Sequence, residues 1–226
     1  LPVMLLMENA SSNLTGNTVA AKPAVATVLH TVKVAIADRY NEWNLTAAGI
    51  SKQAFDYAVK GYQYLKQKNM LKNTDVITIV DYSKPSSEKR LFVVDMNEGK
   101  ILFQTLVAHG RNTGEEFANS FSNAAQSFKS SLGFYATGEV YNGKHGLSLR
   151  LDGLEKGIND NARNRGVVMH AADYVSNSFV KNNKRLGRSQ GCPAIPVGLS
   201  KEIISAIKDK SCLFIYHPKL VSQLLS

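Results

Sequence analysis

Residues 166–194 read GVVMHAADYVSNSFVKNNKRLGRSQGCPA. The stretch opens with apolar, partly β-branched residues up to His170, a pattern typical of a buried strand. It closes in a turn of Gly, Ser and Pro around Cys192, where no long apolar face could bury a thiol. Gly191 allows the backbone to turn sharply and allows a ligand to approach the chain closely. The stretch therefore predicts a strand that ends beside an accessible cysteine.

Cys192 and His170 have the residue types of a nucleophile and its base. A thiol must lose its proton before it attacks, and a histidine 22 positions upstream, at the rim of a strand, could accept that proton. Backbone N–H groups of Gly191 and Cys192 could stabilise an oxyanion, and the charge of Arg188 is expected to lower the thiol pKa. From these residues alone, a catalytic cysteine and an ordinary loop cysteine remain open alternatives.

The other histidines have weaker settings. His109 and His145 each precede a glycine at a predicted strand edge, where a histidine can line a cleft, although histidines that only support a turn are more common. His30 lies in a polar N-terminal stretch and His217 follows the last predicted strand, so both are expected at the surface. His109 and His145 are therefore additional candidates for a binding site.

Cys212 differs from Cys192 in its surroundings. It lies in an apolar run at residues 211–216, where a cysteine behaves as a small buried hydrophobic residue. A disulfide between the two cysteines stays open in an oxidising compartment, and it would block the nucleophile. The sequence contains no C-x-x-C or H-E-x-x-H pairing, so we predict no metal site.

The periodicity of apolar residues separates a helical part from a longer β-rich part. Three- and four-residue steps predict a helix that begins after Ser51, which can cap it. Strands are predicted at residues 75–82, 90–95, 100–108, 146–151, 166–170 and 211–216, with a hairpin connection at 97–99. A late helix is predicted over Lys201 to Lys208 with Ser200 as its cap, and residues 182–184 are predicted to be a polar loop.

We therefore expect a mainly β protein with a few helices, of the α+β class. Residues 1–44 are expected to form an N-terminal arm or linker, residues 45–74 a helical segment packed on the main domain, and residues 75–226 the catalytic domain. The opening residues LPVMLLM are too short to span a membrane. They are either the end of a signal peptide, which we favour, or a frayed terminus.

The charge balance bears on the class of partner. The 226 residues include 27 Lys and Arg against 18 Asp and Glu, a formal net charge of +9, which favours a polyanionic neighbour such as nucleic acid, an anionic membrane surface or a wall polymer. The basic residues are spread along the chain and no nucleic-acid-binding motif is visible, so nucleic acid is not expected as a partner. No apolar run approaches the roughly 18 to 20 residues that cross a bilayer, so no integral membrane span is expected.

Several motifs together resemble the L,D-transpeptidases with a YkuD-like catalytic domain, and most closely their murein L,D-transpeptidase catalytic-domain branch. His170 is followed by AADYVS, and residues 187–194 read GRSQGCPA, similar to the S-x-G-C turn of that family. Four further segments occur in the same order: VAHG at 107–110, SSLG at 130–133, KHGLSLRL at 144–151 and NDNA at 159–162. The resemblance covers roughly residues 45–217.

The resemblance implies a YkuD-like β-sandwich domain that acts on the tetrapeptide stems of peptidoglycan without a cofactor. Cys192 would attack the carbonyl of the third residue, a diamino acid, and release D-alanine, with His170 as base and Gly191 in the oxyanion-binding turn. An amine of a second stem would resolve the thioester into a 3→3 cross-link, and carbapenems would acylate the same thiol. The candidate substrate contacts are Arg188, Ser189, Gln190, His109, His145 and Tyr174.

Two positions depart from the larger family. Gln190 stands where a second histidine is usual, which leaves His170 as the only evident base, and Ala194 stands where an arginine or asparagine is frequent. With water as acceptor, the same chemistry makes an L,D-carboxypeptidase, and a cleft that only grips stems makes a non-catalytic wall-binding module. We expect an exported monomer in the periplasm or associated with the cell wall.

Overall fold

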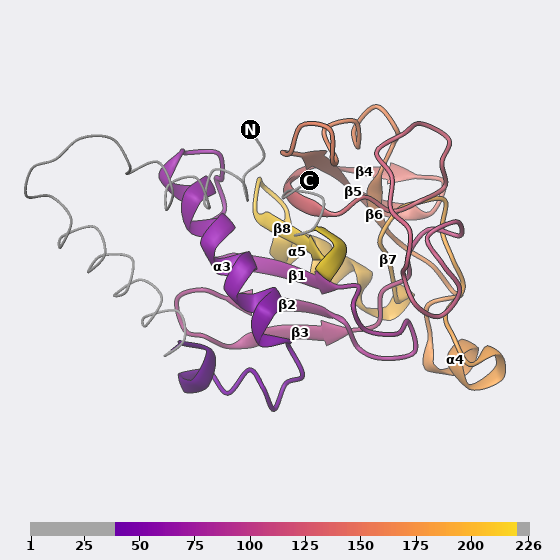
Figure 1. Cartoon of the computed structure of the whole chain (residues 1–226), viewed down its shortest axis with the longest axis horizontal. Coiled ribbons are helices and arrows are strands. Elements are labelled where there is room, and N and C mark those ends of the chain that lie inside the picture. Colours follow the sequence, from indigo (N-terminus) through magenta and orange to yellow (C-terminus); the bar gives the residue numbers. More distant parts are fainter. Residues whose placement is uncertain (1–38, 221–226) are drawn as a thin grey trace, which may run out of the picture.

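The computed structural model describes residues 39–220. The helices and strands bounded within this range are α3 (Lys52–Gln67), β1 (Val76–Asp81), β2 (Leu91–Asp95), β3 (Ile101–Thr105), β4 (Gly133–Gly143), β5 (Gly146–Gly153), β6 (Val168–Ala171), α4 (Asn177–Asn183), β7 (Ala194–Ile195), the 3-10 helix η1 (Val197–Leu199), α5 (Ser200–Ile207) and β8 (Cys212–Tyr216). The expected mainly β class with few helices is confirmed (Figure 1). The predicted end of a signal peptide and most of the expected N-terminal arm lie outside the described residues.

The eight strands join in one hydrogen-bonded sheet in the order β3-β2-β1-β8-β4-β5-β6-β7. The last strand, β8, lies inside the sheet, parallel to β1 and antiparallel to β4. Every residue of β8 is buried, which explains why its sequence is a continuous apolar run. Figure 1 shows β1, β2 and β3 on one side of β8 and β4, β5 and β6 on its other side.

β3 and β7 form the two edges of the sheet, and the chain that follows β3 pairs with β7. Ala108 forms an antiparallel bridge with Ala194 of β7, in which the Ala108 nitrogen lies 2.9 Å from the Ala194 carbonyl oxygen. Gly110 then forms a parallel bridge with Ser189. The chain that leaves β3 is thereby joined to the turn that contains Cys192, so this turn is held by residues from distant parts of the sequence.

The helix α3 packs on the sheet through its predicted apolar face. Ser51 caps it, since the Ser51 hydroxyl accepts a hydrogen bond of 3.3 Å from the Ala54 N–H. Its buried apolar residues belong to the same core as the strands: Ala54, Phe55, Ala58, Val59, Tyr62 and Leu65. Helix and sheet therefore share one core, and the division of the chain at residue 74 remains a proposal from the sequence.

β4 has no counterpart in the sequence prediction. It contains glycines at both ends and at position 138, which are residues typical of turns. It nevertheless pairs with both β5 and β8, and its register with β5 shifts between Thr137 and Val140. Gly138 lies in this bulge, where a Cβ would be 3.1 Å from the Arg150 Cβ. The glycine that reads as a turn residue in the sequence therefore lies at a crowded position in the bulge.

The region around α4 corrects a second prediction. Residues 182–184, predicted as a polar loop, contain the end of α4 and its left-handed C-cap Lys184. The helix begins after Ser176, whose hydroxyl accepts a hydrogen bond from the Phe179 N–H at 3.2 Å. No residue of α4 is buried, so apolar periodicity could not indicate it. The two-residue strand β7 was likewise too short to predict.

The predicted cap of the late helix is wrong. α5 begins at Ser200 itself, with Leu199 in the N-cap position. The Ser200 hydroxyl donates to the Val197 carbonyl at 2.9 Å and therefore does not accept a hydrogen bond as a capping oxygen would. The predicted apolar face of this helix is present, with Ile203, Ile204 and Ile207 buried.

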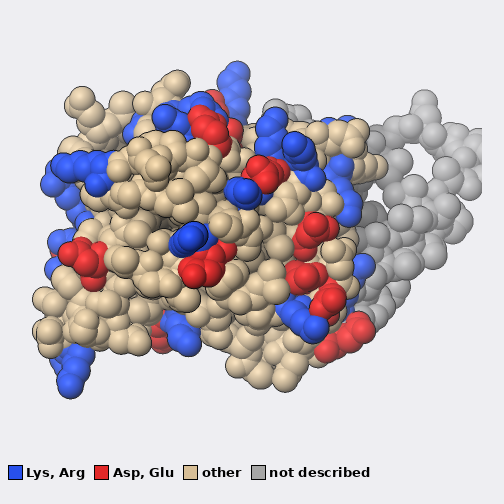
Figure 2. Space-filling view, turned by 180° about the vertical axis from the view of Figure 1, so that it is seen from behind, with Lys and Arg blue, Asp and Glu red and all other residues tan. Residues whose placement is uncertain are grey.

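Charged side chains are mixed on the face opposite to that of Figure 1. Figure 2 shows basic and acidic residues interspersed over this face, without a continuous basic area. The described surface also contains an ion-pair network in which Arg163 pairs with Glu139 and Asp152, and Arg150 pairs with Glu139. No helix in the described range of residues 39–220 is long and apolar enough to cross a membrane.

Candidate active site

The strand β6 positions His170 between two neighbours. His170 is opposite Ser148 of β5 and opposite Ala194 of β7, and it is only 4% exposed. Its Nδ1 lies 2.8 Å from the Ala171 carbonyl oxygen. Because a carbonyl can only accept, Nδ1 carries the hydrogen and Nε2 of the neutral ring keeps its lone pair. The strand thus presents an imidazole whose free nitrogen is defined.

His145 stacks on His170. The two ring centroids are 4.5 Å apart and the ring planes differ by 24°. His145 lies in the turn between β4 and β5 and is exposed. Burial lowers the pKa of His170, the hydrogen bond to Ala171 raises it, and the proximity of His145 lowers it further. The net effect lowers the pKa of His170 below its usual value, which favours the neutral ring.

The turn before Cys192 is held by two serines. The Ser189 hydroxyl accepts from the Gly191 N–H at 3.0 Å and donates to the Cys192 carbonyl at 2.6 Å. Ser130, from the loop before β4, donates its hydroxyl to the Gly191 carbonyl at 3.2 Å. Gly191 has a φ of +123°, and a Cβ there would lie 2.9 Å from the Lys129 carbonyl oxygen. This position therefore requires glycine.

The expected pair of oxyanion donors is reduced to one by this arrangement. The Gly191 N–H already donates to Ser189, so it is not free to bind a substrate oxygen. Within the described residues, the Cys192 N–H donates no hydrogen bond. The remaining backbone donor beside the thiol is therefore that of Cys192 itself.

The Cys192 thiol is held by the start of β6. Its Sγ lies 3.5 Å from the Val168 N–H nitrogen and 3.8 Å from the Gly166 carbonyl oxygen, to which the S–H can donate. Burial raises the pKa of Cys192, whereas the Val168 hydrogen bond and the charge of Arg165 lower it, and the net shift is upward. Both cysteines are free, so no disulfide blocks Cys192.

The expectation that Arg188 lowers the thiol pKa is wrong. The cation that acts on Cys192 is Arg165. Arg188 instead forms an ion pair with Glu115 at 2.5 Å, and its Nη1 also donates to the carbonyls of Arg111 and Gly114. Arg188 therefore ties the Cys turn to the loop after Gly110, and its charge is compensated by Glu115.

A cleft of about 620 Å³ brings most of the predicted site residues together. Its lining includes Cys192, His170, His145, Tyr174, Arg188, Ser189 and Gln190, together with Gln126, Phe128, Tyr141, Lys144, Ser148, Arg165, Gly166, Val167 and Val168. Burial is the main cause that raises the pKa of Tyr174 to about 12, so its hydroxyl stays protonated and can donate a hydrogen bond. The cleft thus holds a thiol, a neutral imidazole and a phenol.

Comparison with known families identifies the domain that carries this cleft. A sequence model described as the L,D-transpeptidase catalytic domain matches residues 46–216. The chain belongs to this family. The match begins before α3 and ends with β8, so it includes the whole sheet and the cleft of the L,D-transpeptidase domain.

Two solved bacterial structures are partly similar to this chain. An L,D-transpeptidase from Mycobacterium smegmatis is 12% identical, and the match covers 63% of this chain and 59% of that chain with a TM-score of 0.39. The helical cell shape determining protein Pgp2 from Campylobacter jejuni, as a point mutant, is 17% identical, covering 72% of this chain and 54% of that chain with a TM-score of 0.43. The matches thus span less than two thirds of both solved chains. No curated protein matches.

His109 does not contact the cleft of this L,D-transpeptidase domain, contrary to the sequence expectation. It is 1% exposed, and Arg90 donates to its Nδ1 at 2.8 Å while its Nε2–H donates to the Gly114 carbonyl at 3.2 Å. Burial and the charge of Arg90 lower the pKa of His109 to about 3. His109 is therefore a neutral structural residue that supports the loop to which Arg188 binds.

Sequence reasoning missed Arg165, which lines the transpeptidase cleft beside Gly191. Ser130, in the segment SSLG at 130–133, was also not predicted to contact the site, although its hydroxyl donates to the Gly191 carbonyl in the turn before Cys192. Arg163 and Arg165 both lie in the turn before β6, where strand periodicity does not indicate which way a side chain faces, so the sequence carried no signal that separates them. Arg163 faces the surface network with Glu139 and Asp152, and Arg165 faces the cleft.

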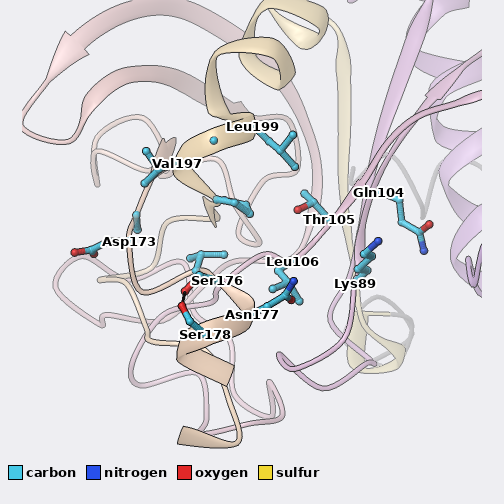
Figure 3. A pocket seen from close by; sticks show the side chains of 14 residues that line it. Lys89, Gln104, Thr105, Leu106, Asp173, Ser176, Asn177, Ser178, Val197 and Leu199 are labelled. Atoms are coloured by element: carbon cyan, nitrogen blue, oxygen red, sulfur yellow. Dashed lines mark hydrogen bonds between the residues drawn. The ribbon is translucent and has the colours of Figure 1, made fainter. Parts of the chain in front are cut away.

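A second cavity, of about 590 Å³, lies on the other side of the segment after β6. Figure 3 shows its lining, with Asp173, Ser176, Asn177 and Ser178 from this segment and Thr105 and Leu106 from the end of β3. Cys192 and His170 are not among its lining residues, so it is separate from the transpeptidase site. No group of three or more His, Cys, Asp or Glu residues that could hold a metal ion occurs in residues 39–220.

Proposed function

We propose that the protein is a peptidoglycan L,D-transpeptidase with Cys192 as nucleophile and His170 as base. The observation that carries the proposal is that one cleft contains both side chains on a rigid strand and a tight turn. Membership of a family that acts on the cell wall supports peptidoglycan as the substrate class. The expected location is outside the inner membrane, in the periplasm or at the wall, where this substrate is found.

The directions of the pKa shifts support a neutral resting pair. Burial raises the pKa of Cys192 and lowers that of His170, so a thiol and a neutral imidazole coexist near pH 7. His170 then acts as a general base through Nε2, because its Nδ1–H is held by Ala171. The thiol must turn from the Gly166 carbonyl toward His170 for this transfer, which a bound substrate can induce.

The reaction follows as two acyl transfers. Cys192 gives its proton to His170 and attacks the carbonyl of the diamino acid, and the oxyanion is stabilised by the Cys192 N–H. The amide C–N bond breaks, His170 protonates the leaving D-alanine amine, and a thioester remains on Cys192. An acceptor amine then attacks the thioester, its extra proton passes to His170, and the thiolate leaves and recovers that proton. Tyr174 lines the cleft, and its protonated hydroxyl would donate a hydrogen bond to the stem.

The charge of the cleft supports a donor stem that carries carboxylates. Lys144 and Arg165 line it without an ion pair among the described residues, and none of its described lining residues is Asp or Glu. Arg188 also lines it, but its charge is compensated by Glu115. Peptide stems end in a carboxylate, so a positive field in the cleft would favour their binding. A carboxypeptidase reaction, with water in place of the acceptor amine, uses the same residues and remains the closest alternative.

The test is incubation of the reduced protein with a disaccharide-tetrapeptide, followed by mass spectrometry of the products. We expect D-alanine release and stem dimers, both lost in Cys192→Ala and retained in Cys212→Ala, a matched control that removes the other cysteine. A carbapenem should add its mass to wild type and to Cys212→Ala, and not to Cys192→Ala. Trimmed monomers alone would replace the proposal by a carboxypeptidase. No turnover and no acylation of reduced protein would favour a wall-binding module.

A further inference from the structure

Arg165 is a cleft arginine that is firmly held without an acidic partner. Its Nη1 donates to the Ser122 carbonyl at 2.8 Å and to the Ser131 hydroxyl at 2.5 Å. Its Nη2 donates to the Lys129 carbonyl at 2.6 Å and to the Ser127 hydroxyl at 3.2 Å. All four acceptors are neutral, and no ion pair of Arg165 occurs among the described residues. The guanidinium is therefore fixed in place with its charge uncompensated.

This charge lies directly behind the nucleophile. A Cβ on Gly191 would be 3.3 Å from Arg165 Nη2, so the guanidinium packs against the residue that precedes Cys192. The Lys129 carbonyl oxygen lies between Arg165 and Gly191. It accepts a hydrogen bond from Arg165, and it would be 2.9 Å from a Cβ on Gly191. The loop before β4 therefore clamps the arginine against the turn.

The other charged groups around the thiol do not supply an equivalent field. Arg188 is compensated by Glu115, and Lys144 is exposed on a flexible side chain. The remaining titratable groups that line the cleft are Tyr141, His145, His170 and Tyr174, and none of these is a permanent cation. Tyr82 is fully buried, and Lys129, on the adjoining loop, does not line the cleft and donates its ammonium group to the Ser120 hydroxyl at 2.7 Å. Arg165 is thus the one cleft cation in the described range that is both fixed and unpaired.

We propose that Arg165 is a positioning residue that provides the fixed positive charge against which the Cys192 thiolate forms. The proposal deepens the proposed function, because it assigns the electrostatic support of the same nucleophile. Burial raises the pKa of Cys192 and lowers that of Arg165, and each group partly offsets the shift of the other, because the charge of Arg165 lowers the pKa of Cys192 and Cys192 raises that of Arg165. Arginine suits this role because it stays protonated in a partly buried site and its planar group holds several acceptors at once.

The test measures the thiol and needs no substrate. The rate of iodoacetamide alkylation at Cys192 is followed by peptide mass mapping from pH 5 to 10 in wild type, Arg165→Gln and Arg165→Lys. Loss of the charge in Arg165→Gln should move the alkylation midpoint to higher pH and slow alkylation at pH 7 roughly tenfold. Arg165→Lys keeps a charge and should restore most of the rate.

Arg163→Gln is the matched control. It removes the same net charge two residues away, from a side chain that pairs with Glu139 and Asp152 outside the cleft. We expect it to leave the midpoint unchanged. Equal midpoints in wild type and Arg165→Gln, or equal shifts in the two Gln variants, would overturn the proposal.

Folding and function can be separated in the same series. If Arg165→Gln does not fold, Arg165→Lys decides the question, because it loses hydrogen bonds and keeps the charge. If Arg165→Lys has the alkylation midpoint of wild type and a lower melting temperature, the proposal is supported. If its alkylation midpoint is higher than that of wild type by about one pH unit or more, the proposal is contradicted. If Arg165→Gln shifts the alkylation midpoint as expected but the wild-type protein does not turn over peptide stems, the proposed function fails while this inference stands.

Discussion

The rings of His145 and His170 are stacked 4.5 Å apart, so the candidate base shares its environment with a second imidazole. The exposed His145 covers one face of the nearly buried His170 and helps to keep its pKa low. The positive charge that His170 would take up during catalysis therefore forms beside another titratable ring. This pair links the turn between β4 and β5 to the chemistry of β6.

Replacement of His145 tests that link. His145→Ala removes both the neighbouring ring and its shielding from water, and each change should raise the pKa of His170. We expect the midpoint of the His170 titration, measured by NMR of the ring carbon, to rise by about half a unit or more. His145→Phe, which keeps an aromatic ring without a charge, should give a smaller rise. A lower midpoint in His145→Ala would contradict this account.

Gly191→Ala should damage both the turn and the thiol. The new Cβ would be strained by the φ of +123° and crowded against the Lys129 carbonyl, at an expected cost of about 2 to 3 kcal/mol. Gly157→Ala is the control, because its φ of +79° carries strain with no atom within 4 Å of the Cβ. Urea unfolding should show the larger loss of stability for Gly191→Ala, and alkylation of Cys192 should change only in that variant.

The low pKa of the buried His109 should make the stability of the protein depend on pH. Its pKa is lowered from 6.5, the ordinary value of an exposed histidine, to about 3 in the folded protein, so only the unfolded state binds the proton between these limits. The stabilising contribution is complete above pH 6.5 and is lost as the pH falls toward 3. We expect a clearly lower melting temperature at about pH 5 than at about pH 7.5, and a smaller difference in His109→Gln. His217→Gln, at a half-buried histidine, should reduce this difference in melting temperature less than His109→Gln does.

Gly61→Ala should loosen the contact between α3 and the sheet. A Cβ at residue 61 would lie 1.9 Å from Phe134 Cζ. Either the buried Phe134 ring, which is stacked on Phe214, must shift, or the helix must move off β4. Overpacking of this kind costs about 1 to 3 kcal/mol, of which the better helix propensity of alanine returns at most about 1 kcal/mol. The control is Gly198→Ala, where the Cβ meets no atom within 4 Å. Equal urea midpoints for the two variants would show that α3 adapts without cost.

Local patterns made part of this structure predictable. The face of α3 and the six predicted strands follow from apolar periodicity over short windows, and all are present. Cys192 and His170 were selected because their settings, a Gly-Ser-Pro turn and the end of an apolar strand, are visible within a few residues. Their presence in one cleft follows from the pairing of β6 with β7.

Other features depend on partners that are distant in the sequence. Arg188 and Arg165 look equivalent in the sequence. In the folded protein Arg188 pairs with the carboxylate of Glu115, whereas Arg165 donates only to neutral acceptors. His109 resembles a cleft residue until Arg90 covers it. β4 was missed because Gly138 reads as a turn residue, whereas the bulge in which it lies forms only against β5.

The sheet cannot assemble without β8, the last described strand, because β8 joins its two halves. Residues 212–216 follow all the other strands along the sequence, yet β1 and β4 both pair with them and not with each other. During synthesis, both of these strands must wait with open edges until β8 has emerged, and such edges readily bind other chains. A stop codon or a protease cut that removes residues 212–216 would therefore abolish the assembled sheet and the cleft around Cys192, although Cys192 and His170 are both present in the shortened polypeptide.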